Sequence, residues 1–276
     1  MNRLPIERRA QILRLLVEGN SIRAITRISD VSKNTVTKLL CSVGSKCLDY
    51  QDEVLRNLPC ERLQCDEIWS FCYAKEKKVP EEMRGHFGFG DVWTWTAICA
   101  DTKLVPCWHV ARRSAEDANA FIKDLASRLR NRVQLTTDGH KPYLNAVKGT
   151  FESEIDYAVL LKIYGPSRDG ERRYGPSECI GTERFIISGQ PDQEHISTSF
   201  IERGNLSMRM GMRRFTRLTN AFSKKIENLA HAVSLHFMHY NFARIHQTLR
   251  ITPAMVAGVT SHVWEIEEIA ALEDSN

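Results

Sequence analysis

A succession of strand and helix patterns leaves few folds open to this chain. The first pattern, over 62–74 (RLQCDEIWSFCYA), places apolar residues at every second position except at Glu67, as in a β-strand. Further strands are expected over 92–100, 104–111, 133–137, 157–164 and 183–188, with helices over 114–130 and 140–147 and a polar, Gly- and Pro-rich loop over 167–177. Three strands followed by alternating helices and strands predict an α/β fold in which helices flank a mixed sheet.

The first 48 residues form a separate, all-helical pattern. An amphipathic helix over 6–17 ends at Gly19, and Ser21 and Ser32 can cap two further helices. Two short helices, a tight turn and a third capped helix predict a helix-turn-helix, although a purely structural three-helix bundle has the same pattern. The last helix of the motif lies in the major groove of DNA. The residues expected to contact DNA are therefore Lys33, Asn34, Thr35 and Lys38.

The charge of the chain is unevenly distributed. The net charge is +4, but residues 1–48 hold nine Lys and Arg against three Asp and Glu, a net +6, so the remainder carries −2. The last sixteen residues contain five acidic residues and no Lys or Arg. A basic amino-terminal part and an acidic carboxy-terminal tail favour a nucleic-acid partner.

No segment indicates a membrane partner or secretion. No apolar run approaches the length that spans a bilayer, and the amino terminus lacks the apolar core of a signal peptide. We therefore expect a cytoplasmic protein whose eight cysteines are reduced and mostly buried. Cys60, Cys65 and Cys72 lie closest together but form no Cys-x-x-Cys pair, which argues against a zinc site.

A long basic helix is expected from Thr198 or Ser199 to Lys225. Seven basic residues and no acidic residue lie between Arg203 and Lys225, and Glu202 stands at the head of this run. If the helix persists, residues at i+4 spacing share one basic face. Such a face suits a phosphate backbone, although a solvated basic helix has the same composition. The residues expected to contact DNA here are Arg203, Arg209, Arg213 and Arg217, the last three at i+4 spacing.

Three acidic residues on separate predicted elements could converge on a metal centre. Asp66 lies on the first strand, Asp138 follows the fourth strand and Glu202 begins the basic helix. Phosphoryl transfer on DNA uses two divalent ions about 4 Å apart, held by carboxylates that leave positions open for phosphate and water. The spacing does not exclude four other acids, Glu67, Asp91, Asp101 and Asp156.

Five pieces of the sequence resemble DDE transposases of bacterial insertion sequences, of the insertion sequence one type: LQCDEIWSF, TTDGHKPY, FIERGN, RRFTRLTNAFSKK and NFARIHQTLRITPAMVAG. The resemblance covers about residues 63–258 and implies the RNase H-like fold shared with retroviral integrases. It also implies two Mg²⁺ or Mn²⁺ ions at Asp66, Asp138 and Glu202, and a basic position after the glutamate at Arg209. Transposases of that type often begin with a zinc-binding module, whereas this sequence starts at the predicted helix-turn-helix.

The resemblance makes a geometric prediction. In an RNase H-like sheet the first and fourth strands are neighbours, which would bring Asp66 and Asp138 together beneath Glu202. Carboxylates this close repel each other, so at least one is expected to have a raised pKa. His140, next to Asp138, is a weaker candidate for contact with the site. We expect His109 to be a core or surface residue and assign no chemistry to His246. The tryptophans on the predicted strands are expected in the core: Trp69, Trp93, Trp95 and Trp108.

The implied function is that of a DNA transposase, which cuts and joins transposon ends by two-metal phosphoryl transfer. Its partners would be terminal inverted repeats, target DNA and further copies of the chain in a homo-oligomer. Two alternatives stay open: a DNA-binding regulator derived from an inactive transposase, and an RNase H-like nuclease that does not join strands. The expected domains are a helix-turn-helix over 1–48, a linker over 49–60, a catalytic domain over 61–258 and an acidic tail over 259–276.

Overall fold

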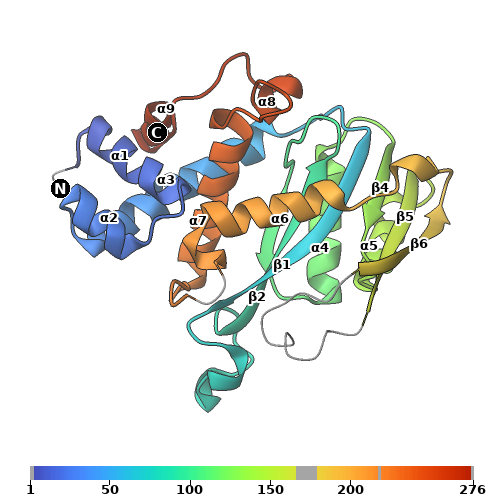
Figure 1. The fold of residues 1–276 in the computed structure, drawn as a ribbon, viewed down its shortest axis with the longest axis horizontal. Helices are drawn as coiled ribbons and strands as arrows, with labels where there is room; N and C mark the ends of the chain where they lie inside the picture. Colours follow the sequence, from blue (N-terminus) through green and yellow to red (C-terminus); the bar gives the residue numbers. More distant parts are fainter. Residues whose placement is uncertain (1–2, 166–178, 217–218, 275–276) are drawn as a thin grey trace.

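A computed structural model describes residues 3–165, 179–216 and 219–274 of the chain (Figure 1). Its helices are α1 (Ile6–Val17), α2 (Ile22–Ser29), α3 (Lys33–Val54), α4 (Ala115–Arg128), α5 (Pro142–Phe151), α6 (Ser199–Gly211), α7 (Ile226–Met238), α8 (Pro253–Val256) and α9 (Ile266–Ala271). Its strands are β1 (Arg62–Cys72), β2 (Gly90–Cys99), β3 (Trp108–Ala111), β4 (Val133–Thr137), β5 (Ile155–Tyr164) and β6 (Cys179–Ser188). Arg217 and the expected loop over 167–177 lie outside the described residues.

The strands form one mixed sheet in the order β3-β2-β1-β4-β5-β6. β1 is parallel to β4, and β4 to β5, whereas the β1–β2, β2–β3 and β5–β6 pairs are antiparallel. Helices α4 and α5 cover one face of the sheet and α6 crosses the other (Figure 1). This arrangement confirms the predicted α/β fold, an RNase H-like mixed sheet flanked by helices, and it places the first and fourth strands side by side as predicted.

Side chains of β1 and β2 hold helices against both faces of the sheet. On one face, the Gln64 side chain of β1 accepts hydrogen bonds from the backbone amides of Phe200 (2.9 Å) and Ile201 (3.1 Å). These bonds satisfy the first turn of α6, whose amides have no partner inside the helix. On the other face, the buried ring of Trp95 on β2 packs edge-on against Tyr143 of α5. Helix α6 is therefore fixed to the central strand close to the predicted acids.

Helices α1, α2 and α3 form an amino-terminal bundle over the residues where a helix-turn-helix was predicted. Ser21 and Ser32 cap α2 and α3 as expected, each by accepting a hydrogen bond from a backbone amide of the first turn. Helix α3 does not stop near residue 48, where the domain boundary was expected, but continues to Val54 through part of the expected linker.

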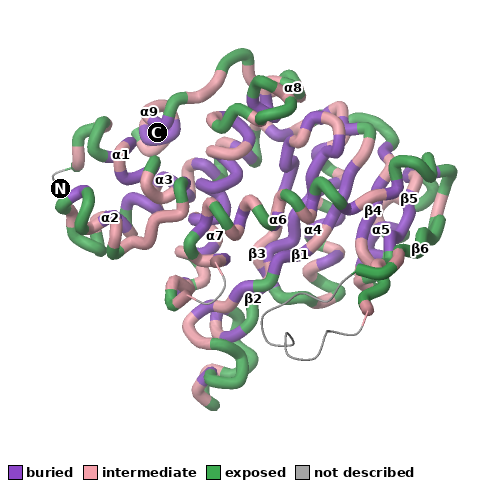
Figure 2. Tube along the Cα trace, viewed as in Figure 1, coloured by how far each residue is buried: buried purple, intermediate pink, exposed green. Residues whose placement is uncertain are grey.

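The extended α3 packs along α7, which lies between the amino-terminal bundle and the sheet (Figure 1). The Ser234 hydroxyl of α7 donates a hydrogen bond to the backbone carbonyl of Gly44 over 2.7 Å. A Cβ atom at Gly44 would lie 2.5 Å from the His231 carbonyl oxygen, so only glycine permits this approach. Buried residues run without interruption from the bundle through α7 into the sheet (Figure 2).

The acidic residues near the carboxy terminus are folded rather than extended as a free tail. Helix α9 packs against α1, and the Arg9 guanidinium, with its side chain only 7% exposed, bonds to Glu273 at 3.1 Å and to Asp274 at 2.7 Å. Arg14 forms a further ion pair with Glu267. The positive charge of the first helix is thus partly balanced by the negative charge of the last residues.

The long basic helix expected over 198–225 is wrong. Helix α6 ends at Gly211, Met212 is extended with φ −124° and ψ 107°, and a 3₁₀ turn over Arg213–Phe215 follows. The helix stops because the chain turns inward there: Met212 and Phe215 are both buried. Arg209 and Arg213 consequently do not share a helical face.

The expected strand over 104–111 is also shorter than predicted, because β3 begins only at Trp108. Pro106 lies in the part of the predicted strand that is not a β-strand in the structure, and proline has no amide hydrogen to donate to a sheet. Trp95 lies in the core as expected, but Trp69 is 38% exposed.

The cysteines agree with the expectation of reduced, mostly buried thiols. All eight are free; six of them are buried, Cys41 is intermediate and Cys179 is exposed. Within the described ranges, no helix combines the length and the apolarity needed to cross a bilayer.

Candidate active site

Two of the predicted acids meet because two parallel strands end at the same level. The β1–β4 register pairs Cys65 with Thr137, the last residue of β4. The next residue along each strand is acidic, Asp66 on β1 and Asp138 after β4. Their carboxylate oxygens lie within 4.8 Å of each other and of one oxygen of Glu67.

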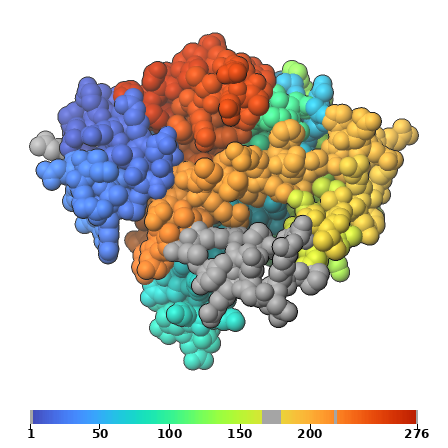
Figure 3. All heavy atoms as spheres, viewed as in Figure 1, coloured from blue at the N-terminus to red at the C-terminus, as the bar shows by residue number. Residues whose placement is uncertain are grey.

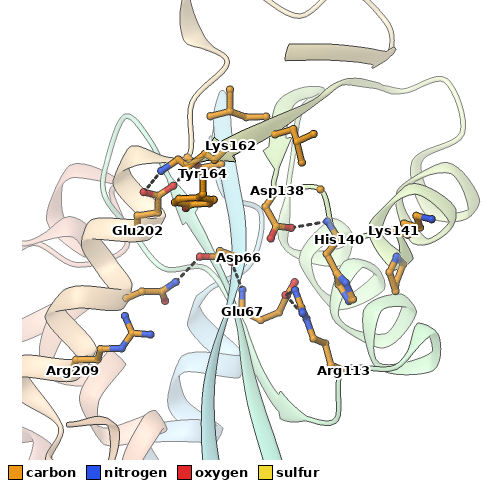
Figure 4. A pocket seen from close by; sticks show the side chains of 16 residues that line it. Asp66, Glu67, Arg113, Asp138, His140, Lys141, Lys162, Tyr164, Glu202 and Arg209 are labelled. Atoms are coloured by element: carbon orange, nitrogen blue, oxygen red, sulfur yellow. Dashed lines mark hydrogen bonds and ion pairs between the residues drawn. The ribbon is translucent and has the colours of Figure 1, made fainter. Parts of the chain in front are cut away.

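Backbone and side-chain amides orient both aspartates (Figure 4). Asp66 accepts hydrogen bonds from the Glu67 amide and from the Asn205 side chain of α6, each over 2.8 Å. Asp138 accepts one from the His140 amide over 3.0 Å. Each carboxylate therefore keeps oxygen lone pairs that are free to bind a ligand in the space between the strand ends and α6.

Glu67 joins the group although strand alternation sends it to the opposite face of β1 from Asp66. Because β4 ends at Thr137, Asp138 lies beyond the edge of the ladder and can approach residues of both faces. The Glu67 side chain has no exposed surface, and its Oε2 pairs with Arg113 over 3.0 Å. Glu67 was one of four rival acids in the sequence, and the structure places it among the candidate ligands.

Glu202, the third predicted acid, lies on α6 and lines the same cavity as the two aspartates (Figure 4). It accepts a hydrogen bond from the Thr198 hydroxyl over 2.5 Å and forms an ion pair with Lys162 of β5. The cavity has a volume of about 840 Å³. Its other polar lining residues are Arg113, His140, Lys141, Lys162, Tyr164, Thr198, Asn205 and Arg209.

The prediction of a raised carboxylate pKa is confirmed, with burial as its main cause. Burial, assisted by the charge of Asp138, raises the pKa of Asp66 to about 6. Burial also raises the pKa of Glu67 to about 7, although the Tyr143 hydroxyl acts in the opposite direction. The repulsion expected between neighbouring carboxylates is thus a smaller contribution than the loss of water.

The donor set fits a hard divalent cation. Carboxylate oxygens are the ligands that Mg²⁺ prefers, and three acidic side chains converge within 4.8 Å. Glu67 Oε1 is a buried acceptor without a hydrogen-bond partner among the described residues. A buried acceptor without a partner costs free energy, and a cation would remove that cost.

The predicted basic residues separate onto different sides of α6. Arg209 lines the acidic cavity together with Glu202 and Asn205, because residues seven and three apart share a helical face. Arg203 points away from the acids and lines a second cavity. Arg213 is exposed in the 3₁₀ turn after the helix, and Arg217 lies outside the described part of the chain.

The predicted helix-turn-helix residues lie on the first two turns of α3, and none lines the acidic cavity. Lys33, Asn34 and Lys38 are exposed. Thr35 is half-buried, and its hydroxyl lies 2.9 Å from the Ser32 hydroxyl. Their side chains are therefore available to a ligand at the amino-terminal end of the helix.

Several lining residues were not anticipated from the sequence. Asn205 follows Glu202 by three residues, a spacing that could have indicated it on a helix. Lys162 and Arg113 had no comparable indication, because they come from β5 and from the segment between β3 and α4. His140 lines the cavity, and its pKa is lowered mainly by burial.

No protein-family model matches this sequence, and no curated protein matches it. Among solved structures, the chain is similar to one described as a piggyBac transposase synaptic complex with hairpin DNA, determined by cryo-electron microscopy. The match covers 97% of this chain and 69% of that chain at 11% sequence identity, with a TM-score of 0.38. The RNase H-like assignment accordingly stands on the strand order and pairing of this chain itself.

Proposed function

We propose that this protein is a DNA transposase of the DDE class that cuts and joins DNA ends by phosphoryl transfer. Asp66, Asp138 and Glu202 would hold two divalent ions, Mg²⁺ or Mn²⁺. The observation that carries the proposal is that these three acids, from a central strand, a neighbouring strand end and a crossing helix, line one cavity. Asp66 and Asp138 approach within 4.8 Å there, and Glu202 faces them from α6. Glu67 is a fourth acid in position to contribute a ligand.

The protein's own groups have separable roles in this reaction. When bound, such ions lower the pKa of an attacking water or 3′-hydroxyl and stabilise the leaving oxygen. Asn205 orients the Asp66 carboxylate through its 2.8 Å hydrogen bond. Arg209, on the same helical face as Glu202, is placed to contact the DNA backbone beside the acids. Lys162 competes with a cation for the Glu202 carboxylate, because they form an ion pair.

DNA recognition is assigned to a second part of the chain. Residues 1–48 would act as the helix-turn-helix, residues 49–60 as the connection, 61–258 as the catalytic domain and 259–276 as the acidic carboxy-terminal segment. The exposed start of α3 supports contacts from Lys33, Asn34, Thr35 and Lys38 to terminal inverted repeats. The proposal also includes contacts to DNA from four arginines: Arg203, Arg209, Arg213 and Arg217. It further includes a homo-oligomer that assembles on paired ends and target DNA, and a cytoplasmic location.

The deciding experiment incubates the full chain with end-labelled transposon DNA and Mg²⁺, and compares it with Asp138→Asn. We expect cleavage and joining by the unaltered protein and neither reaction by the variant, with DNA binding retained. Asp91→Asn is the matched control, because Asp91 is exposed and does not line the acidic cavity.

Two results would redirect the proposal. DNA binding without any cleavage by the unaltered protein, in Mg²⁺ and in Mn²⁺, would favour a DNA-binding regulator. Cleavage without joined products would favour a nuclease that does not join strands.

A further inference from the structure

A second cavity, of about 350 Å³, lies on the opposite flank of α6 from the acids. One wall is formed by α6 and the other by residues 240–248, which include the end of a π-helical turn over His239–Ala243. In the space-filling view, the segment that follows α7 in the sequence, in red, borders one edge of the orange α6 (Figure 3). Lys103 and Ile98 close the cavity from the sheet side.

Four basic side chains line this cavity. The four are Lys103, Arg203, Arg244 and His246, and no Asp or Glu is among the described lining residues. The guanidinium groups of Arg203 and Arg244 make no hydrogen bond or ion pair with any part of the chain that the structure describes. Neutral donors accompany them on Ser207, Gln247 and Thr248. The cavity therefore presents positive charge without a protein anion to balance it.

Lys103 is held in position by its surroundings. Its backbone has a φ of 62°, a left-handed conformation that residues with a side chain rarely adopt. The Tyr240 hydroxyl donates a hydrogen bond to the Lys103 carbonyl over 3.0 Å, and the Lys103 ammonium lies 3.4 Å from the centre of the Phe200 ring. A residue kept in a costly conformation by specific contacts is typical of a functional site.

The wall formed by residues 240–248 is also tied to the segment that follows Lys103. The Asn241 side chain donates to the Val105 carbonyl over 2.9 Å and accepts from the Val105 amide over 3.0 Å. Asn241 is fully buried, and a π-helical turn is itself common at functional sites. His246 is oriented by contact between its Nδ1 and the Thr248 hydroxyl at 3.0 Å. The basic groups are thus mounted on a rigid frame.

We infer that this basic cavity binds a phosphate of a DNA strand, at a second contact separated from the carboxylates by the width of α6. The identity of the ligand rests on the proposed function, because DNA is the polyanion that the transposase reaction requires. A helix with its side chains is about 10 Å across, so one DNA segment lying over α6 reaches both cavities. Arginine suits this position because its planar fork binds phosphate oxygens in pairs.

The test measures how DNA affinity depends on salt. The full chain and Arg203→Gln/Arg244→Gln are titrated with a labelled duplex in EDTA at several salt concentrations. Each phosphate contact contributes about 0.9 to the slope of log K against log [salt], so a double variant that loses the contact to this phosphate is expected to lower the slope by about 1. Its affinity should fall to a similar extent for unrelated sequences, because phosphate contacts carry no sequence information.

The matched control is Lys123→Gln/Lys148→Gln, which removes the same charge from exposed positions of α4 and α5 outside the cavity. Its slope is expected to stay close to that of the unaltered chain. Equal slopes for the unaltered chain and the arginine variant, or equal losses in both double variants, would overturn the inference. Thermal unfolding of each variant verifies that a lost slope is not lost folding.

Two further measurements distinguish a DNA phosphate site from a site for free phosphate, and distinguish this inference from the proposed transposase function. Calorimetric titration with inorganic phosphate identifies a site for free phosphate: saturation at micromolar phosphate, with an unchanged DNA slope, would contradict the DNA assignment. Cleavage in Mg²⁺ is scored independently. A slope loss in a protein that never cleaves DNA supports the phosphate contact and removes the transposase proposal, whereas cleavage with an unchanged slope does the reverse.

Discussion

The two flanks of α6 differ in whether their charged side chains already have partners within the protein. On one flank, each acid has a partner: Glu202 has Lys162, Glu67 has Arg113, and Asp66 has Asn205. On the other flank, Arg203 and Arg244 have none among the described residues. A cation on the acidic flank therefore competes with protein partners for some of the carboxylate oxygens, while the basic flank can accept an anion directly.

The largest expected effect comes from substituting the acids on the acidic flank of α6 while leaving the basic flank unchanged. Glu202→Gln should lower cleavage and joining by about 10³-fold or more, because ligands that act as a set cannot replace one another. Adding Asp66→Asn should cost little more, for the same reason. Gel-based cleavage of end-labelled DNA measures both variants. A double variant that multiplies the two single losses would show that the acids act separately.

Glu202→Gln should leave the salt slope of DNA binding unchanged, which provides the internal control. A slope that falls as far as in the Arg203→Gln/Arg244→Gln variant would mean that the two flanks are not independent.

The second prediction concerns pH and stability. Asp66 and Glu67 have folded-state pKa values of about 6 and about 7, above those of the unfolded chain, so the folded state binds more protons between about pH 4 and pH 7. The free energy of unfolding without metal should therefore fall as the pH rises through this range. Asp66→Asn should remove about 2 kcal/mol of this fall.

Urea unfolding at pH 5 and pH 8 in EDTA measures this difference, of which about 1.4 kcal/mol is expected between these two pH values. A divalent ion should restore the stability at pH 8 in the unaltered chain and much less in the variant, by mass action on the folded state. Stability that rises from pH 5 to pH 8 by the same amount in both proteins would contradict the assignment.

A smaller effect should follow from freeing Glu202. The Lys162–Glu202 pair is partly exposed, with side chains 28% and 41% accessible, and such pairs contribute about 1 kcal/mol or less. Lys162→Met should therefore tighten Mg²⁺ binding by no more than about fivefold, as measured by calorimetry. Weaker Mg²⁺ binding in this variant would assign Lys162 a supporting rather than a competing role. Lys123→Met is the control for loss of a distant charge.

The smallest effect tests α6 itself. Gly204 lies within the helix, and a Cβ atom there would meet no atom within 4 Å. Gly204→Ala should therefore raise the free energy of unfolding by about 0.5–1 kcal/mol, because glycine loses more backbone freedom on folding. Metal-induced stabilisation should not change. A loss of stability would indicate that the helix bends at Gly204.

The sequence predicted the strands that carry the site better than it predicted which acidic residues line it. Strand periodicity and the order of elements predicted a mixed sheet flanked by helices, and the resemblance to an RNase H-like fold implied that β1 lies beside β4. This adjacency brings Asp66 to Asp138. Glu67 was not separable from the rival acids, because alternation along a strand assigns it to the other face. Only the early end of β4 lets Asp138 reach both faces, and the pattern of 133–137 does not reveal that consequence.

The basic features were predicted less well, for two physical reasons. The i+4 spacing of Arg209 and Arg213 is meaningful only on a continuous helix, and burial of Met212 and Phe215 ends the helix first. The basic cavity joins Lys103 to Arg203 and Arg244 from three segments of the chain. No local pattern relates such segments, because tertiary packing alone brings them together.

The contacts of α3 with α7 and of α1 with α9 have a consequence for the order in which the molecule forms. During synthesis the first three helices emerge first, yet the helices that cover them are made near the end of the sequence. Until then the apolar flank of α3 has no cover, and Arg9 has no acidic partner. Contacts between residues so distant in sequence close large loops and slow folding. We expect the amino-terminal helices to become rigid only after residues 226–274 have been added.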